Sequence, residues 1–82
     1  MVGLKEAIDK AIDYAKFMNI GNEIFNMRVE EVRASGNEWQ ITLGWDDRFL
    51  NHNGIFSETK RIYKVFNVNK TTGNINEVVI RE

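Results

Sequence analysis

The stretch "WQITLGW", residues 39–45, decides the fold of this 82-residue chain. Apolar side chains occupy every second position of it. They are Trp39, Ile41, Leu43 and Trp45. The positions between them are polar or carry no side chain, and strict alternation of this kind is typical of a strand with one buried face. The stretch therefore predicts a sheet that is covered on one side.

Upstream of this strand, "SGNE" (35–38) predicts a turn, and residues 25–35 predict a second strand. Apolar residues alternate there from Phe25 to Val29 and then change phase at Val32. A change of phase within a strand indicates a β-bulge, because one extra residue moves the following side chains to the other face.

Residues 3–20 predict an amphipathic helix, which Gly21 is placed to end. Its apolar residues follow the i, i+3, i+4 spacing and fall within an arc of about 140°. They are Leu4, Ala7, Ile8, Ala11, Ile12, Ala15 and Met18. Three alanines one turn apart (7, 11 and 15) indicate that the helix approaches another surface closely.

Downstream, residues 57–69 and 74–81 predict two more strands around the turn "NKTTGN" (69–74). In the first of them Tyr63 faces one way and Phe66 the other, which indicates either a bulge or a strand covered on both sides. With strands near 25–35 and 38–48, the chain is predicted to be a single α+β domain over 1–82. Its one N-terminal helix packs on a curled, four-stranded antiparallel β-meander, the outer face of which is left to solvent or to a second subunit.

Composition excludes several classes of function. The chain has 11 Lys and Arg against 12 Asp and Glu, a net charge of −1, and a pI near 5.8, whereas nucleic-acid binders cluster basic residues. It has no cysteine, hence no disulfide or thiolate site. The N-terminus has no unbroken apolar segment, so we expect no signal peptide, no membrane contact and, taking Met1 as the native start, a cytoplasmic protein.

The chemistry-bearing residues do not form a recognisable catalytic or metal motif. His52, Asp46 and Asp47 supply three metal ligands at most, and adjacent strand residues point to opposite faces. Neither serine lies in a nucleophile elbow. Glu30 and Glu31 lie between two arginines (28 and 33), which indicates surface charge pairing. We predict a non-enzymatic protein with no catalytic residues, no metal and no cofactor.

The connection "GWDDRFLNHNGIF" (44–56) is too long for a simple hairpin loop. Because Asn53-Gly54 favours a type I′ turn, the flanking strands are expected to extend into it as an arm. The arm carries four large apolar residues: Phe49, Leu50, Ile55 and Phe56. They either contact another protein, such as a second copy, or fold back over the chain's own core.

The aromatic residues Trp39, Trp45 and Tyr63 offer two interpretations. They fill the core, or they line a small-ligand pocket between sheet and helix. Of the two tryptophans, Trp45 is expected to be the more exposed, since it lies near the end of its strand.

Three stretches, "LKEAIDKAIDYAK" (4–16), "NEWQITLGW" (37–45) and "YKVFNVNKTTGNI" (63–75), resemble the small PepSY-like and cystatin-like domains. Those domains have an alanine-rich helix, a strand with tryptophan, and a penultimate strand ending in a "vDxxTGxv" turn. Asn69 stands here where that turn has aspartate, and its side-chain oxygen can also cap the turn. The resemblance implies the helix-plus-sheet fold and a non-catalytic module that restrains peptidases or binds other proteins. Small immunity proteins related to the nuclear transport factor fold share these features.

From these patterns we expect a protein–protein interaction module that self-associates, for instance as a homodimer, through the 44–58 arm or the sheet face. An immunity or inhibitor protein that binds a toxin or a peptidase, and a small-ligand-binding domain, are the alternatives.

Overall fold

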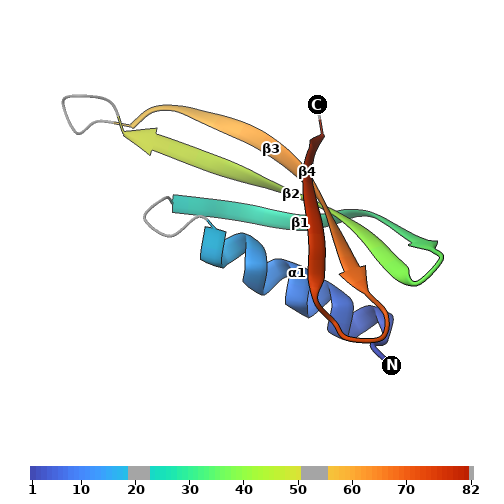
Figure 1. Cartoon of the computed structure of the whole chain (residues 1–82). Coiled ribbons are helices and arrows are strands. Elements are labelled where there is room, and N and C mark those ends of the chain that lie inside the picture. The colour runs from blue at the N-terminus through green and yellow to red at the C-terminus, as the bar shows by residue number, and fades with distance from the viewer. Residues whose placement is uncertain (19–22, 51–55, 82) are drawn as a thin grey trace.

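In a computed structural model the chain forms one helix followed by four strands (Figure 1). Helix α1 spans Leu4–Met18, and the strands are β1 (Glu23–Ser35), β2 (Glu38–Leu50), β3 (Phe56–Asn69) and β4 (Ile75–Arg81). The structure describes the backbone of residues 1–18, 23–50 and 56–81, and the side chains of residues 1–18, 24–46 and 61–76.

The four strands form one antiparallel meander in the order β1-β2-β3-β4. The α+β fold predicted from the sequence is confirmed. Each strand begins and ends within two residues of its predicted bounds, and the helix begins one residue later than predicted. Among the described residues, no helix is long and apolar enough to cross a membrane.

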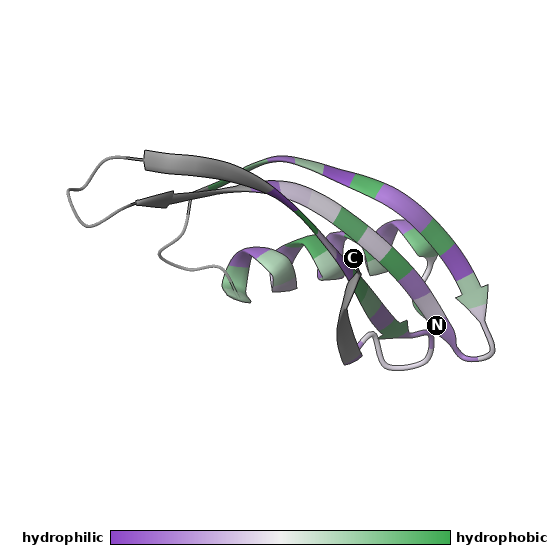
Figure 2. Ribbon diagram, turned by 90° about the horizontal axis from the view of Figure 1, so that it is seen from above, coloured by the Kyte–Doolittle hydropathy of each residue, from purple (hydrophilic) through white to green (hydrophobic). Residues whose placement is uncertain are grey.

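Helix α1 packs against β2 and β3 on one face of the sheet, which we call the inner face. Ala7, Ala11 and Ala15 are fully buried there, so the predicted close approach of the helix is confirmed. The core is completed by alternate residues of the two central strands: Ile41, Leu43, Trp45, Phe66 and Val68. The same alternation is visible as hydropathy bands along the ribbon in Figure 2.

The structure corrects one expectation about the core. Trp45 is fully buried and not the more exposed of the two tryptophans, because the sheet continues past it at both sides. Asp46 and Asp47 still pair with residues of β1 and β3, so Trp45 lies well inside the strand.

Strand β1 contains two bulges, one between Phe25 and Arg28 and one between Val29 and Glu31. The change of apolar phase had predicted one. In the first bulge Asn26 adopts a positive φ of 56°, a left-handed conformation that asparagine tolerates better than most residues. In β3, by contrast, the register with β2 is unbroken past Tyr63, so its two-sided apolar pattern reflects partial cover on both faces.

The molecule is elongated, with principal extents of 48 × 21 × 18 Å. The β2–β3 hairpin accounts for this shape, because at one end it extends beyond both of its neighbours, β1 and β4 (Figure 1). Pairing with β1 ends at Arg48 and pairing with β4 ends at Tyr63, whereas β2 and β3 remain paired as far as Leu50 and Phe56.

The turn between β3 and β4 is closed by Asn69. Its Oδ1 accepts hydrogen bonds from the backbone N–H of Thr71 (2.8 Å) and of Thr72 (2.9 Å). Gly73 follows with a φ of 80°, a conformation that favours glycine. The capping role expected for Asn69 is confirmed.

Candidate functional site

The outer face of the sheet, opposite α1, carries a connected group of polar side chains. We call Asn26, Glu30, Asp46, Arg61 and Tyr63 the Arg61 cluster. They come from three adjacent strands, β1, β2 and β3, and enclose a shallow hollow together with Arg28.

The first bulge of β1 shapes this cluster. Two residues, Asn26 and Met27, lie between the pairs that β1 forms with Asp46 and with Gly44, so the strand bends there. The bend brings the carbonyl oxygen of Asn26 within 2.9 Å of Arg61 Nη1. It also lets Asn26 Nδ2 donate to Asp46 Oδ2 over 2.9 Å. The bulge thus supplies one acceptor and one donor to the cluster.

Arg61 connects the three strands through its guanidinium group. Nη2 donates to Glu30 Oε1 at 3.0 Å and Nη1 donates to Asp46 Oδ1 at 3.2 Å. The three side chains are 27%, 34% and 20% exposed, so water screens these pairs less than it screens pairs at the open surface. These contacts hold the guanidinium group in one orientation.

These contacts change the ionisation of both partners. The hydrogen bond from Asn26 lowers the pKa of Asp46 below its ordinary value of 3.8, and the hydrogen bond from Arg61 lowers it further, although partial desolvation works in the opposite direction. Partial burial by itself lowers the pKa of Arg61, but hydrogen bonds to Glu30 and Asp46 raise it above its usual range. Both groups are thus held in their charged forms.

Tyr63 lies against the sheet at Gly44, its partner on β2. A Cβ atom on Gly44 would lie 3.0 Å from two ring carbons of Tyr63 and 3.0 Å from Glu30 Oε1. The absence of a side chain at position 44 is what lets the ring approach. The guanidinium carbon of Arg61 lies 5.7 Å from the ring centre, within cation–π range. Tyr63 remains 37% exposed.

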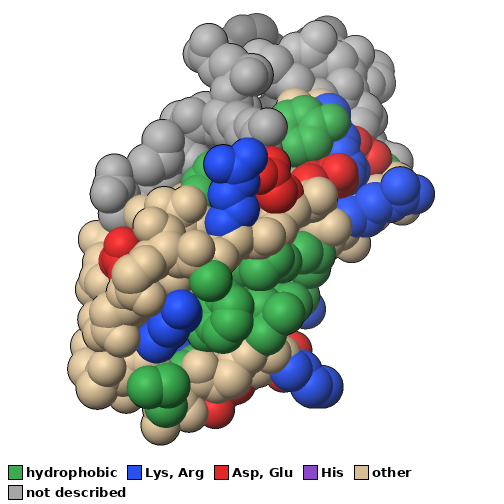
Figure 3. All heavy atoms as spheres, turned by 90° about the vertical axis from the view of Figure 1, so that its right-hand side faces the viewer, with side chains coloured by type: hydrophobic (Ala, Val, Ile, Leu, Met, Phe, Trp, Pro, Cys, Tyr) green, Lys and Arg blue, Asp and Glu red, His purple; other side chains and the backbone are tan. Residues whose placement is uncertain are grey.

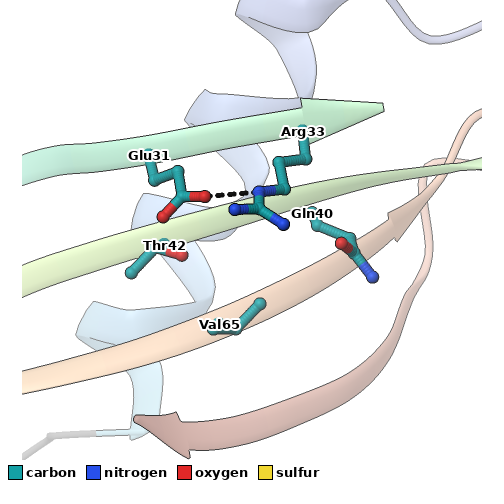
Figure 4. Close-up of a pocket in the computed structure, with 5 residues that line it drawn as sticks. All are labelled: Glu31, Arg33, Gln40, Thr42 and Val65. Atoms are coloured by element: carbon teal, nitrogen blue, oxygen red, sulfur yellow. Dashed lines mark hydrogen bonds and ion pairs between the residues drawn. The ribbon is translucent and has the colours of Figure 1, made fainter. Parts of the chain in front are cut away.

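A second hollow lies beside the cluster on the outer face (Figure 4). It measures about 220 Å³ and is lined, among the described residues, by Glu31 and Arg33 of β1, Gln40 and Thr42 of β2, and Val65 of β3. Arg33 Nε donates to Glu31 across its rim. Thr42 is 4% exposed although it is polar and lies on the outer face.

The three aromatic residues proposed as a pocket do not lie together. Trp45 is buried in the core beneath α1, and Tyr63 lies on the opposite face of the sheet. Trp39 is half-buried near the start of β2. Its Nε1 donates to the carbonyl of Val2 (3.1 Å), and Lys70 Nζ lies 4.7 Å from its ring centre. Figure 3 shows apolar side chains that gather between basic ones on one face of the molecule.

The proposed contact surface on the arm lies outside the residues whose side chains are described. The backbone places Phe49 and Leu50 at the end of β2 and Phe56 at the start of β3, where Leu50 pairs with Phe56. Ile55 and His52 lie outside the described residues, so the arm remains a prediction. Asp46 belongs to the Arg61 cluster, and the described side chains include no group of His, Cys, Asp and Glu arranged to hold a metal ion.

Sequence reasoning missed the cluster although the charge pairing of residues 28–33 was predicted. The predicted bulge, between Val29 and Val32, is the second one of β1, whereas the bulge at Asn26 that shapes the cluster was not predicted. The sequence assigned Glu30 a neighbouring arginine as its partner, whereas the structure pairs it with Arg61, 31 residues away. To find that pair from the sequence, one would need to know the register in which β1 and β3 each pair with β2.

Comparisons with protein-family models, curated proteins and solved structures found no match to this chain. What the structure establishes is the α+β topology alone: an N-terminal helix followed by a four-stranded antiparallel sheet.

Proposed function

We propose that this protein acts by binding another protein through the outer face of its sheet, and that the Arg61 cluster is the centre of the contact. One observation carries the proposal: Tyr63 is exposed, yet its ring is held against Gly44 and beside an arginine that is itself fixed by two carboxylates. Tyrosine and arginine are enriched at the energetic centres of protein interfaces. Side chains ordered before binding lose little conformational entropy when a partner arrives.

The charges of this face support a protein partner over a polyanion. Arg28 and Arg61 are matched by Glu30 and Asp46, so the four charges that line the hollow sum to zero. A surface of balanced charge offers a nucleic acid or an acidic membrane no counterion-release gain. It suits a partner surface of mixed polar and apolar character.

The open shape of the hollows on this face also favours a protein over a small molecule. Ligand pockets usually measure about 300–1,000 Å³ and enclose most of the ligand. The hollow at Thr42 and Val65 measures about 220 Å³ and the one at the Arg61 cluster about 470 Å³, and both lie open on the sheet face. They fit projecting side chains of a partner better than a metabolite, which they would leave largely uncovered.

The resemblance to PepSY-like domains agrees with this role, since those domains bind or restrain other proteins. An immunity or inhibitor protein is one form of the same proposal, in which the partner is a toxin or a peptidase. In each form the protein is a non-catalytic binding module.

Affinity capture with matched tyrosine variants tests the proposal. Tyr63→Ala removes the exposed ring of the cluster, whereas Tyr14→Ala removes a tyrosine of similar exposure (40%) on α1, away from the outer face. Each bait is first checked for a native circular dichroism spectrum. We expect a partner that is retained by the natural protein and by Tyr14→Ala and is lost with Tyr63→Ala. Retention by all three baits, or by none, would contradict the proposal.

A further inference from the structure

Strand β1 is an edge of the sheet, because among the described strands only β2 pairs with it. The unpaired N–H and C=O groups of an edge strand can accept another strand. Bulges interrupt β1 up to Glu31, and bulges discourage such pairing. From Glu31 to Ser35, however, the register with β2 is regular and runs without interruption to the β1–β2 turn.

The geometry of that turn determines which groups point outward. Gly36 is the first of two turn residues and has a φ of 56°, as in a type II′ hairpin closed by Ser35 and Glu38. The residues that flank such a turn exchange hydrogen bonds, and the hydrogen-bonded pairs then alternate along the ladder. Arg33 and Glu31 therefore direct their backbone groups toward β2, whereas Val32 directs its own toward the free edge.

The side chains of this segment divide between the two faces. Glu31 and Arg33 lie on the outer face, at the rim of the hollow in Figure 4. Val32 pairs with Ile41, a core residue, and so faces inward. Because α1 packs on β2 and β3, the inner face of β1 is less covered: Val29 is 40% exposed and Val32 is half-buried.

We propose that β1 pairs with β1 of a second copy of this chain, antiparallel, about a twofold axis at Val32. Val32 then forms a hydrogen-bonded pair with the partner's Val32, and the two apolar side chains meet on the inner face. On the outer face Glu31 lies opposite the partner's Arg33, and Arg33 lies opposite the partner's Glu31. These two are non-hydrogen-bonded pairs, in which facing side chains approach most closely.

Charge selects this register over its neighbours. A twofold axis between Glu30 and Glu31 would set glutamate against glutamate and Arg28 against the partner's Arg33. An axis at Glu31 or at Arg33 would place the residue against its own copy. Like charges directly opposite each other destabilise a sheet. Among the possible axes within the regular segment, only the axis at Val32 places Glu31 and Arg33 each opposite a residue of the other charge.

This pairing goes beyond the proposed function, because it uses the edge of the sheet and leaves Tyr63 and Arg61 uncovered. Two sheets of four strands would become one sheet of eight with two outer-face clusters. A bivalent surface of this kind would bind a repeated or dimeric partner more tightly than one copy could.

Charge-reversal variants test the pairing. Glu31→Arg places two arginine pairs across the axis, and Arg33→Glu places two glutamate pairs there. Each variant alone is expected to dissociate at about tenfold higher concentration than the natural chain, since two favourable pairs become unfavourable. An equimolar mixture of the two variants restores opposite charges at both pairs, so we expect a heterodimer. The double variant Glu31→Arg/Arg33→Glu should dimerise like the natural chain.

Light scattering coupled to size exclusion, over a dilution series from the highest soluble concentration, gives the mass of each species. Circular dichroism confirms that each variant is folded. A natural chain that is monomeric throughout, a dimer unaffected by both reversals, or a mixture that stays monomeric would each overturn the pairing. Tyr63→Ala separates this test from that of the proposed function, because it should abolish partner capture and leave the dimer intact.

Discussion

The effect of Gly44→Ala on stability should depend on the residue at position 63. The substitution should destabilise the natural chain, which has tyrosine there, and stabilise a Tyr63→Ala chain. Glycine within a strand costs roughly 0.5–1 kcal/mol relative to alanine, so the substitution is favourable wherever there is room. Here the new Cβ would lie 3.0 Å from Tyr63 Cδ1, Tyr63 Cε1 and Glu30 Oε1. The glutamate is flexible at its end, but the ring lies on the sheet and must be displaced.

The magnitude follows from these two opposing effects. Overpacking against a positioned ring costs roughly 1–3 kcal/mol, so in the natural chain Gly44→Ala should lower the free energy of unfolding by up to about 2.5 kcal/mol. In a Tyr63→Ala chain only Glu30 Oε1, the end of a flexible side chain, is close to the new Cβ, and Gly44→Ala should instead raise the free energy of unfolding by about 0.5–1 kcal/mol. The coupling between the two positions is then roughly 1–3 kcal/mol.

Urea unfolding followed by tryptophan fluorescence measures all four members of this double-mutant cycle, because buried Trp45 reports on the core. Additive effects, with a coupling near zero, would refute the view that position 44 is bare in order to seat Tyr63. A stabilising Gly44→Ala in the natural chain would refute it equally.

Three further predictions concern the turn, the cluster and the helix. Asn69→Ala removes the acceptor of two backbone N–H groups and should cost about 1–2 kcal/mol in urea unfolding, whereas Asn69→Asp keeps the oxygen and should cost far less. The pKa of Asp46 is lower in the folded state than its ordinary value of 3.8, so the ionised carboxylate stabilises the fold above pH 3.8 and this stabilisation is lost as the pH falls through the folded-state pKa. The natural chain should therefore lose stability below pH 3.8 more steeply than Asp46→Asn. Parallel pH profiles of the two chains would contradict this. Ala11→Leu forces a larger side chain between α1 and the sheet and should cost roughly 1–3 kcal/mol, whereas Lys16→Leu on the exposed side of the helix should change stability by less than about 0.5 kcal/mol; equal effects would contradict the close approach.

The elements of this fold could be predicted because each has a local cause. The alanine ladder of α1 and the alternation of residues 39–45 both arise from contact with one core, so periodicity alone reveals which face is buried. The cap at Asn69 acts within three residues of itself. The exposure of Trp45 was predicted wrongly for the corresponding reason: whether a strand continues past a residue depends on what pairs beside it, and the residue's own neighbours in sequence do not show that.

The Arg61 cluster could not be predicted, because its geometry depends on one residue of register. Asn26 reaches Asp46 and Arg61 through the bulge, and without that extra residue its side chain and its carbonyl would face elsewhere. The sequence placed a change of phase at Val32, which matches the second bulge, but the regular alternation from Phe25 to Val29 gave no sign of the first. Gly44 is the second requirement of the cluster, since only a residue without a side chain leaves room for the ring of Tyr63 from β3. A glycine in the middle of a strand of large side chains thus indicates that a side chain from a neighbouring strand packs over it. Searching for such glycines opposite exposed aromatic residues is a practical way to find surfaces of this kind.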